Sequence, residues 1–188
     1  MLDTKHIING YSLMVMERLE AGWDGYLLTF MYKPIKGSQQ SVNRQMEREL
    51  ERVYAKSLTR IVKKPASQPL DMLPLWIACP DYPVPKGDEK RQSVRDVTVN
   101  DGRHMHAIAV VPPWSRVEEG LANHFDEKQS LYVTEDSTLW RIHAEPITHN
   151  PKRVNDYVLK ALKRSRVGAE EVVILPRTRR EVRKKPKK

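Results

Sequence analysis

Two histidines separated by one apolar residue, His104 and His106, are the side chains in this sequence best placed for chemistry. The apolar run that follows them, residues 107–111, predicts a buried β-strand. Side chains alternate along a strand, so both imidazoles are expected to project from the same face. Imidazole nitrogens commonly bind divalent metal ions. The pair therefore predicts one edge of a metal site on a rigid strand.

A second pair of reactive side chains lies nearer the C-terminus. Tyr157 and Lys160 are three residues apart in a segment, 152–166, whose apolar residues recur at helical spacing. Residues at this separation share one face of a helix. A phenol can act as a nucleophile, and a nearby ammonium could hold a phosphate or activate the phenol. Together with a metal ion, these residues suggest attack by tyrosine on a phosphodiester.

The elements that must position the histidines include a predicted β-hairpin. Residues 94–99 alternate as a strand, and Asn-Asp-Gly at 100–102 is the strongest turn signal in the sequence. A three-residue loop places Asp96 opposite His106 and on the face of both histidines, whereas a two-residue loop places it on the other face. The three-residue register gives a mixed nitrogen and oxygen set suited to Mg²⁺ or Mn²⁺. We therefore predict Asp96 as the third ligand.

The remaining elements follow from periodicity, capping residues and proline positions. We expect a helix over 7–20 that stops at Gly22, strands at 26–32, 75–79 and 139–147, a strand or hairpin arm at 131–134, helices from Ser38 or Ser41 to 62, at 116–125 and at 152–166, and an apolar run at 172–175. The order strand, helix, strand, strand, helix, strand predicts an α+β fold. Its expected form is a ferredoxin-like split βαβ antiparallel sheet, with a C-terminal helix that carries the tyrosine.

Length and charge limit the possible functions. A chain of 188 residues suits one domain, expected at 23–168, with an N-terminal helical segment at 1–22 and a basic tail at 169–188. The formal charge of +9 favours a polyanionic partner. The tail is either disordered or an arm that grips DNA. No signal peptide or membrane span is visible, which places the protein in the cytoplasm without a membrane partner. A single cysteine excludes an internal disulfide, and the sequence shows no Gly-rich phosphate loop.

The residues above resemble the motifs of the HUH endonucleases, in particular the single-tyrosine initiators of rolling-circle replication. In that family a strand carries His-apolar-His, matched at 104–106, and a later helix carries Tyr-x-x-Lys, matched at 157–160. An earlier strand motif is similar to residues 28–32. The family's third metal ligand is often a carboxylate before the first histidine, matched by Asp96, with Asp81 and Asp101 as alternatives. The resemblance covers residues 26–164.

The resemblance implies a metal-dependent, sequence-specific nickase and strand transferase that acts on single-stranded DNA and starts replication of a plasmid or phage. Mg²⁺ or Mn²⁺ on His104, His106 and Asp96 would polarise the scissile phosphate. Tyr157 would form a 5′-phosphotyrosyl link and leave a free 3′-OH, with Lys160 holding the phosphate or activating the phenol. The basic residues expected to bind DNA are Arg103, Lys152, Arg153, Lys163 and Arg164. Expected partners are single-stranded DNA at an origin or hairpin and a host helicase and polymerase.

Two features depart from larger members of the family. Ala161 stands where a second tyrosine would follow Tyr157, and the chain has no helicase domain.

Three polar residues just before the tyrosine helix either join the site or are ordinary strand and loop residues: His143, Glu145 and His149. The same chemistry would suit a transposase or a relaxase. From another class, a non-catalytic nucleic-acid-binding protein remains open, with the histidine pair and the tyrosine serving only as packed residues.

Overall fold

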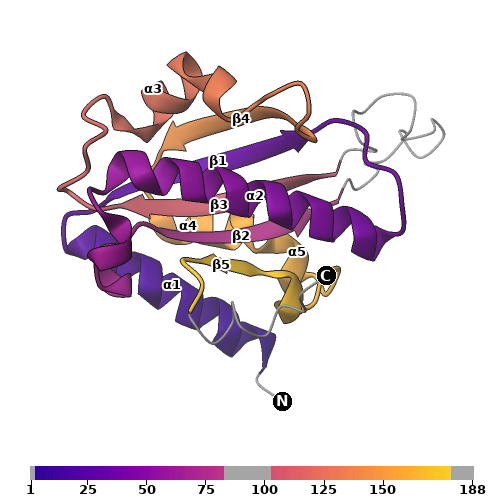
Figure 1. Cartoon of the computed structure of the whole chain (residues 1–188). Coiled ribbons are helices and arrows are strands. Elements are labelled where there is room, and N and C mark those ends of the chain that lie inside the picture. The colour runs from indigo at the N-terminus through magenta and orange to yellow at the C-terminus, as the bar shows by residue number, and fades with distance from the viewer. Residues whose placement is uncertain (1–2, 83–102, 179–188) are drawn as a thin grey trace.

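The computed structural model describes residues 3–82 and 103–178 (Figure 1). Its helices and strands are, in chain order, α1 (Thr4–Glu20), β1 (Asp24–Tyr32), α2 (Gln39–Ile61), β2 (Leu75–Asp81), β3 (His104–Val111), α3 (Gly120–Glu127), β4 (Leu139–Pro146), α4 (Pro151–Val158), α5 (Lys160–Lys163) and β5 (Val173–Leu175). The predicted α+β class is confirmed. Within these ranges, no helix combines the length and the apolar character needed to cross a membrane.

The strands form one open sheet in the order β4-β1-β3-β2-β5, and every described pairing is antiparallel. Because β1 and β2 both run antiparallel to β3, they share one direction with β3 between them. Likewise β3 and β4 share a direction with β1 between them. The helices α2 and α3 make the two crossovers. The sheet also reaches into the segment that the sequence assigned to the basic tail, because β5 pairs with β2.

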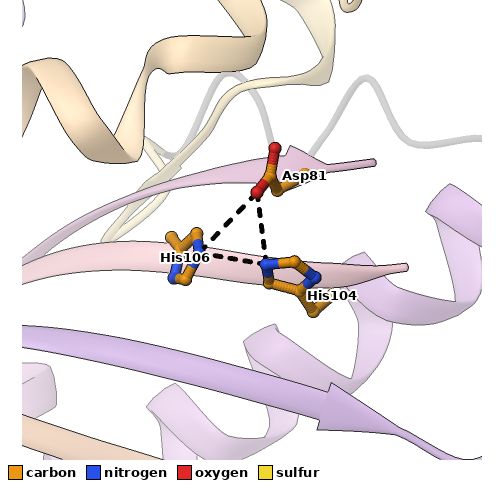
Figure 2. Close-up of side chains that lie close together, drawn as sticks. All are labelled: Asp81, His104 and His106. Carbon is orange, nitrogen blue, oxygen red and sulfur yellow. Dashed lines mark hydrogen bonds and ion pairs between the residues drawn. The ribbon is translucent and has the colours of Figure 1, made fainter. Parts of the chain in front are cut away.

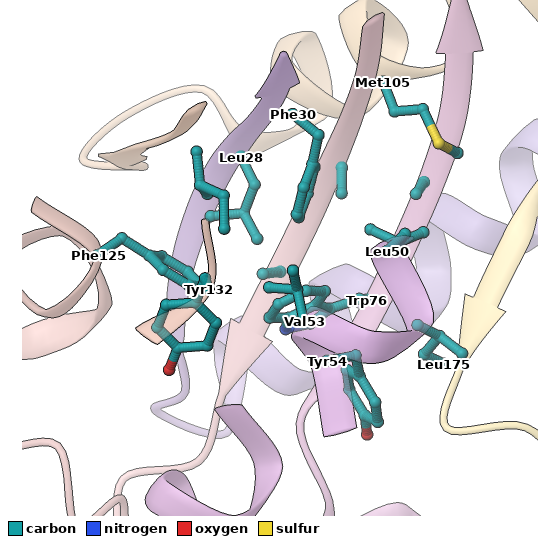
Figure 3. Close-up of a cluster of buried hydrophobic side chains, with 14 of the residues drawn as sticks. Leu28, Phe30, Leu50, Val53, Tyr54, Trp76, Met105, Phe125, Tyr132 and Leu175 are labelled. Carbon is teal, nitrogen blue, oxygen red and sulfur yellow. The ribbon is translucent and has the colours of Figure 1, made fainter. Parts of the chain in front are cut away.

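The helices cover the sheet on both faces, and α2 lies in front of the strands while α4 lies behind them (Figure 1). On the face covered by α2 and α3, hereafter the α2 face, large side chains pack around Trp76 (Figure 3). The rings of Phe30, Tyr54 and Phe125 lie 5.2 to 6.4 Å from the ring of Trp76, measured between centroids. On the opposite face, the α4 face, α1, α4 and α5 pack over Ile77, Ile108 and Val110.

Local sequence signals explain the two long helices. Ser38 caps α2, its hydroxyl accepting a hydrogen bond from the backbone N–H of Ser41. The buried positions of α2 recur at helical spacing toward the sheet, as predicted for the helix that ends near residue 62. The predicted N-terminal helix is confirmed as α1, and Gly22 follows it with a φ of 82°, a conformation that favours glycine.

Three predicted elements differ from the structure. The helix expected from 116 begins only at Gly120, because the Ser115 hydroxyl caps a turn by accepting from the N–H of Val117. The strand expected at 131–134 is wrong: a short 3-10 turn at Gln129–Leu131 instead places the fully buried Tyr132 in the core. The helix expected over 152–166 is interrupted at Leu159, which separates α4 from α5.

The predicted hairpin before β3 falls on residues that the structure does not describe. Its first arm, its turn, Asp96 and Asp101 all lie outside the described residues. Among the described residues, the two lateral neighbours of His106 are Thr29 on β1 and Cys79 on β2. A strand has only two edges, and on β3 both are occupied.

Candidate metal centre and tyrosine site

The candidate site lies where β2 and β3 change from apolar to polar residues. The register pairs Asp81 with His104 and Cys79 with His106. Directly paired residues of an antiparallel sheet project to the same face, so Asp81 and both histidines share the α4 face. The next residues along β3 on that face, Ile108 and Val110, belong to the buried core. Each strand thus anchors its polar end by burying the apolar residues that precede or follow it.

Three ligand atoms converge at this polar end (Figure 2). The Nε2 atoms of His104 and His106 lie 3.0 Å apart. Oδ2 of Asp81 lies 3.2 Å from Nε2 of His104 and 3.8 Å from Nε2 of His106. Asp81 and His106 are almost fully buried, with 5% and 4% of their surface exposed. Two imidazole nitrogens and one carboxylate oxygen therefore face a common point from two adjacent strands.

The electrostatics of the cluster favour an ionised aspartate and a neutral histidine. Burial alone would raise the pKa of Asp81, but hydrogen bonds from His104 and Lys160, together with their charge, lower it to about 2. Burial lowers the pKa of His106 to about 3, and the nearby His104 and Lys160 act in the same direction, against Asp81. At neutral pH, His106 therefore keeps a lone pair for a ligand.

A hydroxyl on the neighbouring strand orients the buried imidazole. Oγ1 of Thr29 lies 3.1 Å from Nδ1 of His106, on the side of the ring opposite the cluster. Such a contact to the second ring nitrogen fixes the rotation of the ring and directs Nε2 toward the ligand point.

The donor set suits a divalent cation. Two nitrogen lone pairs 3.0 Å apart repel each other unless a proton or a cation lies between them. Asp81, His104 and His106 are the group, within the described ranges, whose ligand atoms all lie within 4.8 Å of one another. Imidazole and carboxylate groups are both common ligands of divalent metal ions. The residues therefore form a possible metal site.

Tyr157 and Lys160 lie beside this cluster, and their side chains are neighbours, as their helical spacing predicted. The ring centroids of Tyr157 and His106 are 4.8 Å apart, and Tyr157 is 43% exposed. Nζ of Lys160 lies 4.1 Å from the centroid of the Tyr157 ring and 2.7 Å from Oδ2 of Asp81. Lys160 therefore bridges the carboxylate and the phenol. The interruption at Leu159 does not separate the two side chains, because residues on consecutive turns remain neighbours.

Most of the predicted DNA-binding residues gather on the other side of Tyr157. A hollow of about 410 Å³, hereafter the basic hollow, is lined by Arg153, Asp156, Tyr157, Lys160, Lys163 and Arg164. Within it, Asp156 pairs with Lys163 at 2.9 Å. Lys152 is exposed on α4 but does not line this hollow, and Arg103 directly precedes His104 on β3. The structure thus brings three of the five predicted basic residues to the tyrosine.

A second hollow adjoins Tyr157 on the side of β4. It has a volume of about 510 Å³ and is named here the sheet-edge pocket. Its lining residues are Leu27, Thr29, His106, His143, Glu145, His149, Asn150, Arg153, Val154 and Tyr157. The three polar residues that the sequence left unassigned, His143, Glu145 and His149, therefore line the same pocket as Tyr157 and His106.

Asp81 takes the place in the cluster that the sequence gave to Asp96. The sequence offers Asp81 only as an alternative ligand, because the apolar strand is expected to end at residue 79, before Pro80. Alternation offered a signal: Leu75, Ile77, Cys79 and Asp81 are all odd positions of one strand and share a face. What alternation could not supply was the register that sets Asp81 opposite His104.

Comparisons with known proteins leave the family open. No family model, no curated protein and no solved structure matches this chain.

Proposed function

We propose that this chain is an HUH-type endonuclease: a metal-dependent nickase and strand transferase that cuts single-stranded DNA through a phosphotyrosyl intermediate. The observation that carries the proposal is the exposed Tyr157 ring, 4.8 Å from the buried His106 ring and in contact with Lys160. The strand order is in keeping with it, because β4-β1-β3-β2 with two crossover helices is the ferredoxin-like arrangement.

His104, His106 and Asp81 would hold the ion, Mg²⁺ or Mn²⁺. When bound, the ion would polarise the scissile phosphate and offset the charge that develops on its oxygens. The β-strands contribute rigidity, since both apolar flanks of the cluster are part of a packed core.

Tyr157 would supply the nucleophile. Its phenol oxygen would bond to phosphorus while the bond from phosphorus to the 3′ oxygen breaks, which leaves a 5′-phosphotyrosyl link and a 3′-OH. The phenolic proton is lost to water and the departing 3′ oxygen gains one. Because the link conserves a phosphodiester bond, a later 3′-OH can attack it and rejoin or transfer the strand.

Lys160 would stabilise negative charge on the phenol oxygen or the phosphate. Its ammonium lies over the Tyr157 ring and is held there by Asp81. The basic hollow next to it, with Arg153, Lys163 and Arg164, would follow the DNA backbone. The expected substrate is single-stranded DNA at a replication origin or hairpin, opened by a host helicase and extended by a host polymerase.

A covalent adduct tests the proposal. Wild-type protein, Tyr157→Phe and the matched control Tyr11→Phe, which changes a tyrosine of α1, would each be incubated with a randomised pool of single-stranded DNA and Mn²⁺. On a denaturing gel, protein and DNA are expected to migrate together for the wild type and for Tyr11→Phe. The adduct is expected to be absent for Tyr157→Phe and in EDTA. No wild-type adduct with a pool that binds, or an adduct that survives in Tyr157→Phe, would rule out this chemistry.

A further inference from the structure

The floor of the sheet-edge pocket is formed by the residues that follow His106 across the sheet. Across the sheet, His106 on β3 is opposite Thr29 on β1, and Thr29 is opposite His143 on β4. One step along, Leu27 is opposite Glu145. The floor of the pocket is therefore a direct extension of the α4 face, from the buried histidine to the edge strand. A ligand in the pocket would lie beside the cluster.

The walls of the pocket combine apolar and hydrogen-bonding surface. Leu27 and Val154 supply apolar area on the sheet side and the helix side. His143 and Glu145 stand at the rim with 45% and 62% of their side chains exposed, and the 3.8 Å between Nδ1 and Oε1 makes only a loose ion pair. A volume of about 510 Å³ is within the range of small-ligand pockets. Apolar walls with a polar rim suit a flat heteroaromatic ring, whereas the Glu145 carboxylate disfavours a phosphate.

Tyr157 and Arg153 line both this pocket and the basic hollow. A nucleic-acid strand that followed the basic hollow would therefore pass Tyr157 and could place its next nucleotide in the pocket. Phosphates would lie along the basic side, and a base would turn toward the sheet. In this arrangement the basic hollow would bind the phosphates and the sheet-edge pocket would bind a base.

We propose that the sheet-edge pocket holds one nucleobase of the DNA substrate, next to the phosphate that Tyr157 attacks, and that Glu145 selects a base with an exocyclic amino group. This inference rests on the proposed function. A carboxylate only accepts hydrogen bonds, and adenine, cytosine and guanine each carry an amino group that can donate one. Thymine carries no amino group, and its one ring donor, N3–H, lies between two carbonyl oxygens that repel a carboxylate, so a thymine in the pocket is disfavoured.

Base preference can be measured without the nicking reaction. Tyr157→Phe protein would be mixed with a randomised single-stranded DNA pool and Mn²⁺, and the bound fraction would be sequenced. At one position we expect thymine to be depleted about tenfold, the usual effect of one charge-assisted hydrogen bond. Adding Glu145→Gln should remove the depletion, because an amide both donates and accepts. The matched control Glu135→Gln, which alters an exposed carboxylate outside the pocket, should keep it.

The outcomes separate this inference from the proposed function. If the wild type forms the adduct but thymine depletion is absent, or is the same with Glu145→Gln, the pocket inference is overturned and the nickase stands. If depletion depends on Glu145 but no adduct forms, the pocket inference holds for a DNA-binding protein and the nickase fails. A pool that does not bind overturns both. Thermal unfolding of Glu145→Gln would verify that the edge strand is intact.

Discussion

The two faces of the sheet have different compositions along the same strands. On β3, the residues toward the α2 face, from Met105 to Val111, are apolar and buried along the whole strand. The residues toward the α4 face begin with His104 and His106 and become apolar only at Ile108. One face is a continuous core, whereas the other is a core at one end and a polar site at the other.

This difference shows how a small sheet can hold reactive groups rigidly. The polar end of the α4 face would be costly if it were not supported, because buried charges lose hydration. Here the same strands are fixed by the core on the α2 face, and Asp81 obtains partners from two histidines and a lysine. The comparison predicts that substitutions on the α2 face lower stability, while substitutions at the polar end mainly change ligand binding.

The largest effect is expected for Trp76→Ala. Trp76 is fully buried on the α2 face and contacts three aromatic rings, so its removal leaves a cavity. We expect a loss of about 3 to 5 kcal/mol in the free energy of unfolding. Guanidinium unfolding followed by circular dichroism would measure it. A loss no greater than that caused by Asp81→Asn would contradict the division between the faces.

Asp81→Asn is expected to weaken metal binding by about 100-fold or more. Loss of a residue that only hydrogen-bonds to a metal ligand typically lowers the affinity about 10- to 100-fold, and loss of a ligand itself should cost more. The amide keeps the shape of the side chain but loses its charge. Isothermal titration with Mn²⁺ would measure the affinity. The control is Asp156→Asn, an exposed carboxylate in the basic hollow, which should bind Mn²⁺ as the wild type does. Equal affinities for Asp81→Asn and wild type would exclude Asp81 as a ligand.

Lys160→Met is expected to strengthen Mn²⁺ binding by about tenfold. The Lys160 ammonium lies 2.7 Å from Oδ2 of Asp81, so it competes with a cation for that oxygen and repels its charge. The same titration would show the gain. Lys163→Met removes an equal charge from α5 but from a lysine that pairs with Asp156, and it should change the affinity much less. A weaker affinity in Lys160→Met would mean that the lysine supports the ion instead.

The smallest effect is expected for thiol labelling of Cys79, which lies in the buried part of the α4 face. Burial raises the pKa of this thiol to about 12, so at pH 8 it stays protonated as well as inaccessible. A thiol reagent should leave the native protein almost unlabelled and label it completely in guanidinium. Rapid labelling of native protein would show that the core beside His106 is open to water.

Much of the fold could be predicted from local signals. The aromatic run at 26–32, the capped and periodic helix after Ser38 and the apolar run after His106 all became the expected elements. Errors arose where tertiary packing overrides local preference. Tyr132 lies in an apolar run that resembles a strand, yet its ring packs on Phe125 and its hydroxyl lies 2.8 Å from Nε2 of His124, which suits a turn.

The parts of the candidate site that depend on residues close together in the sequence could be predicted, and the part that depends on distant residues could not. The face shared by His104 and His106 follows from strand alternation, and the proximity of Tyr157 to Lys160 follows from helix spacing. The carboxylate was assigned through a hairpin register, but it comes from β2, more than twenty residues earlier in the chain. Pairing between distant strands depends on the whole sheet, and no local pattern specifies it.

The most direct test of the polar end of the α4 face is a crystal structure of the protein soaked in Mn²⁺, with anomalous scattering recorded at the manganese edge. We predict one strong anomalous peak bounded by Nε2 of His104, Nε2 of His106 and Oδ2 of Asp81, with Lys160 displaced from that oxygen. A peak elsewhere, or none at this cluster at saturating Mn²⁺, would contradict the metal centre and with it the proposed chemistry.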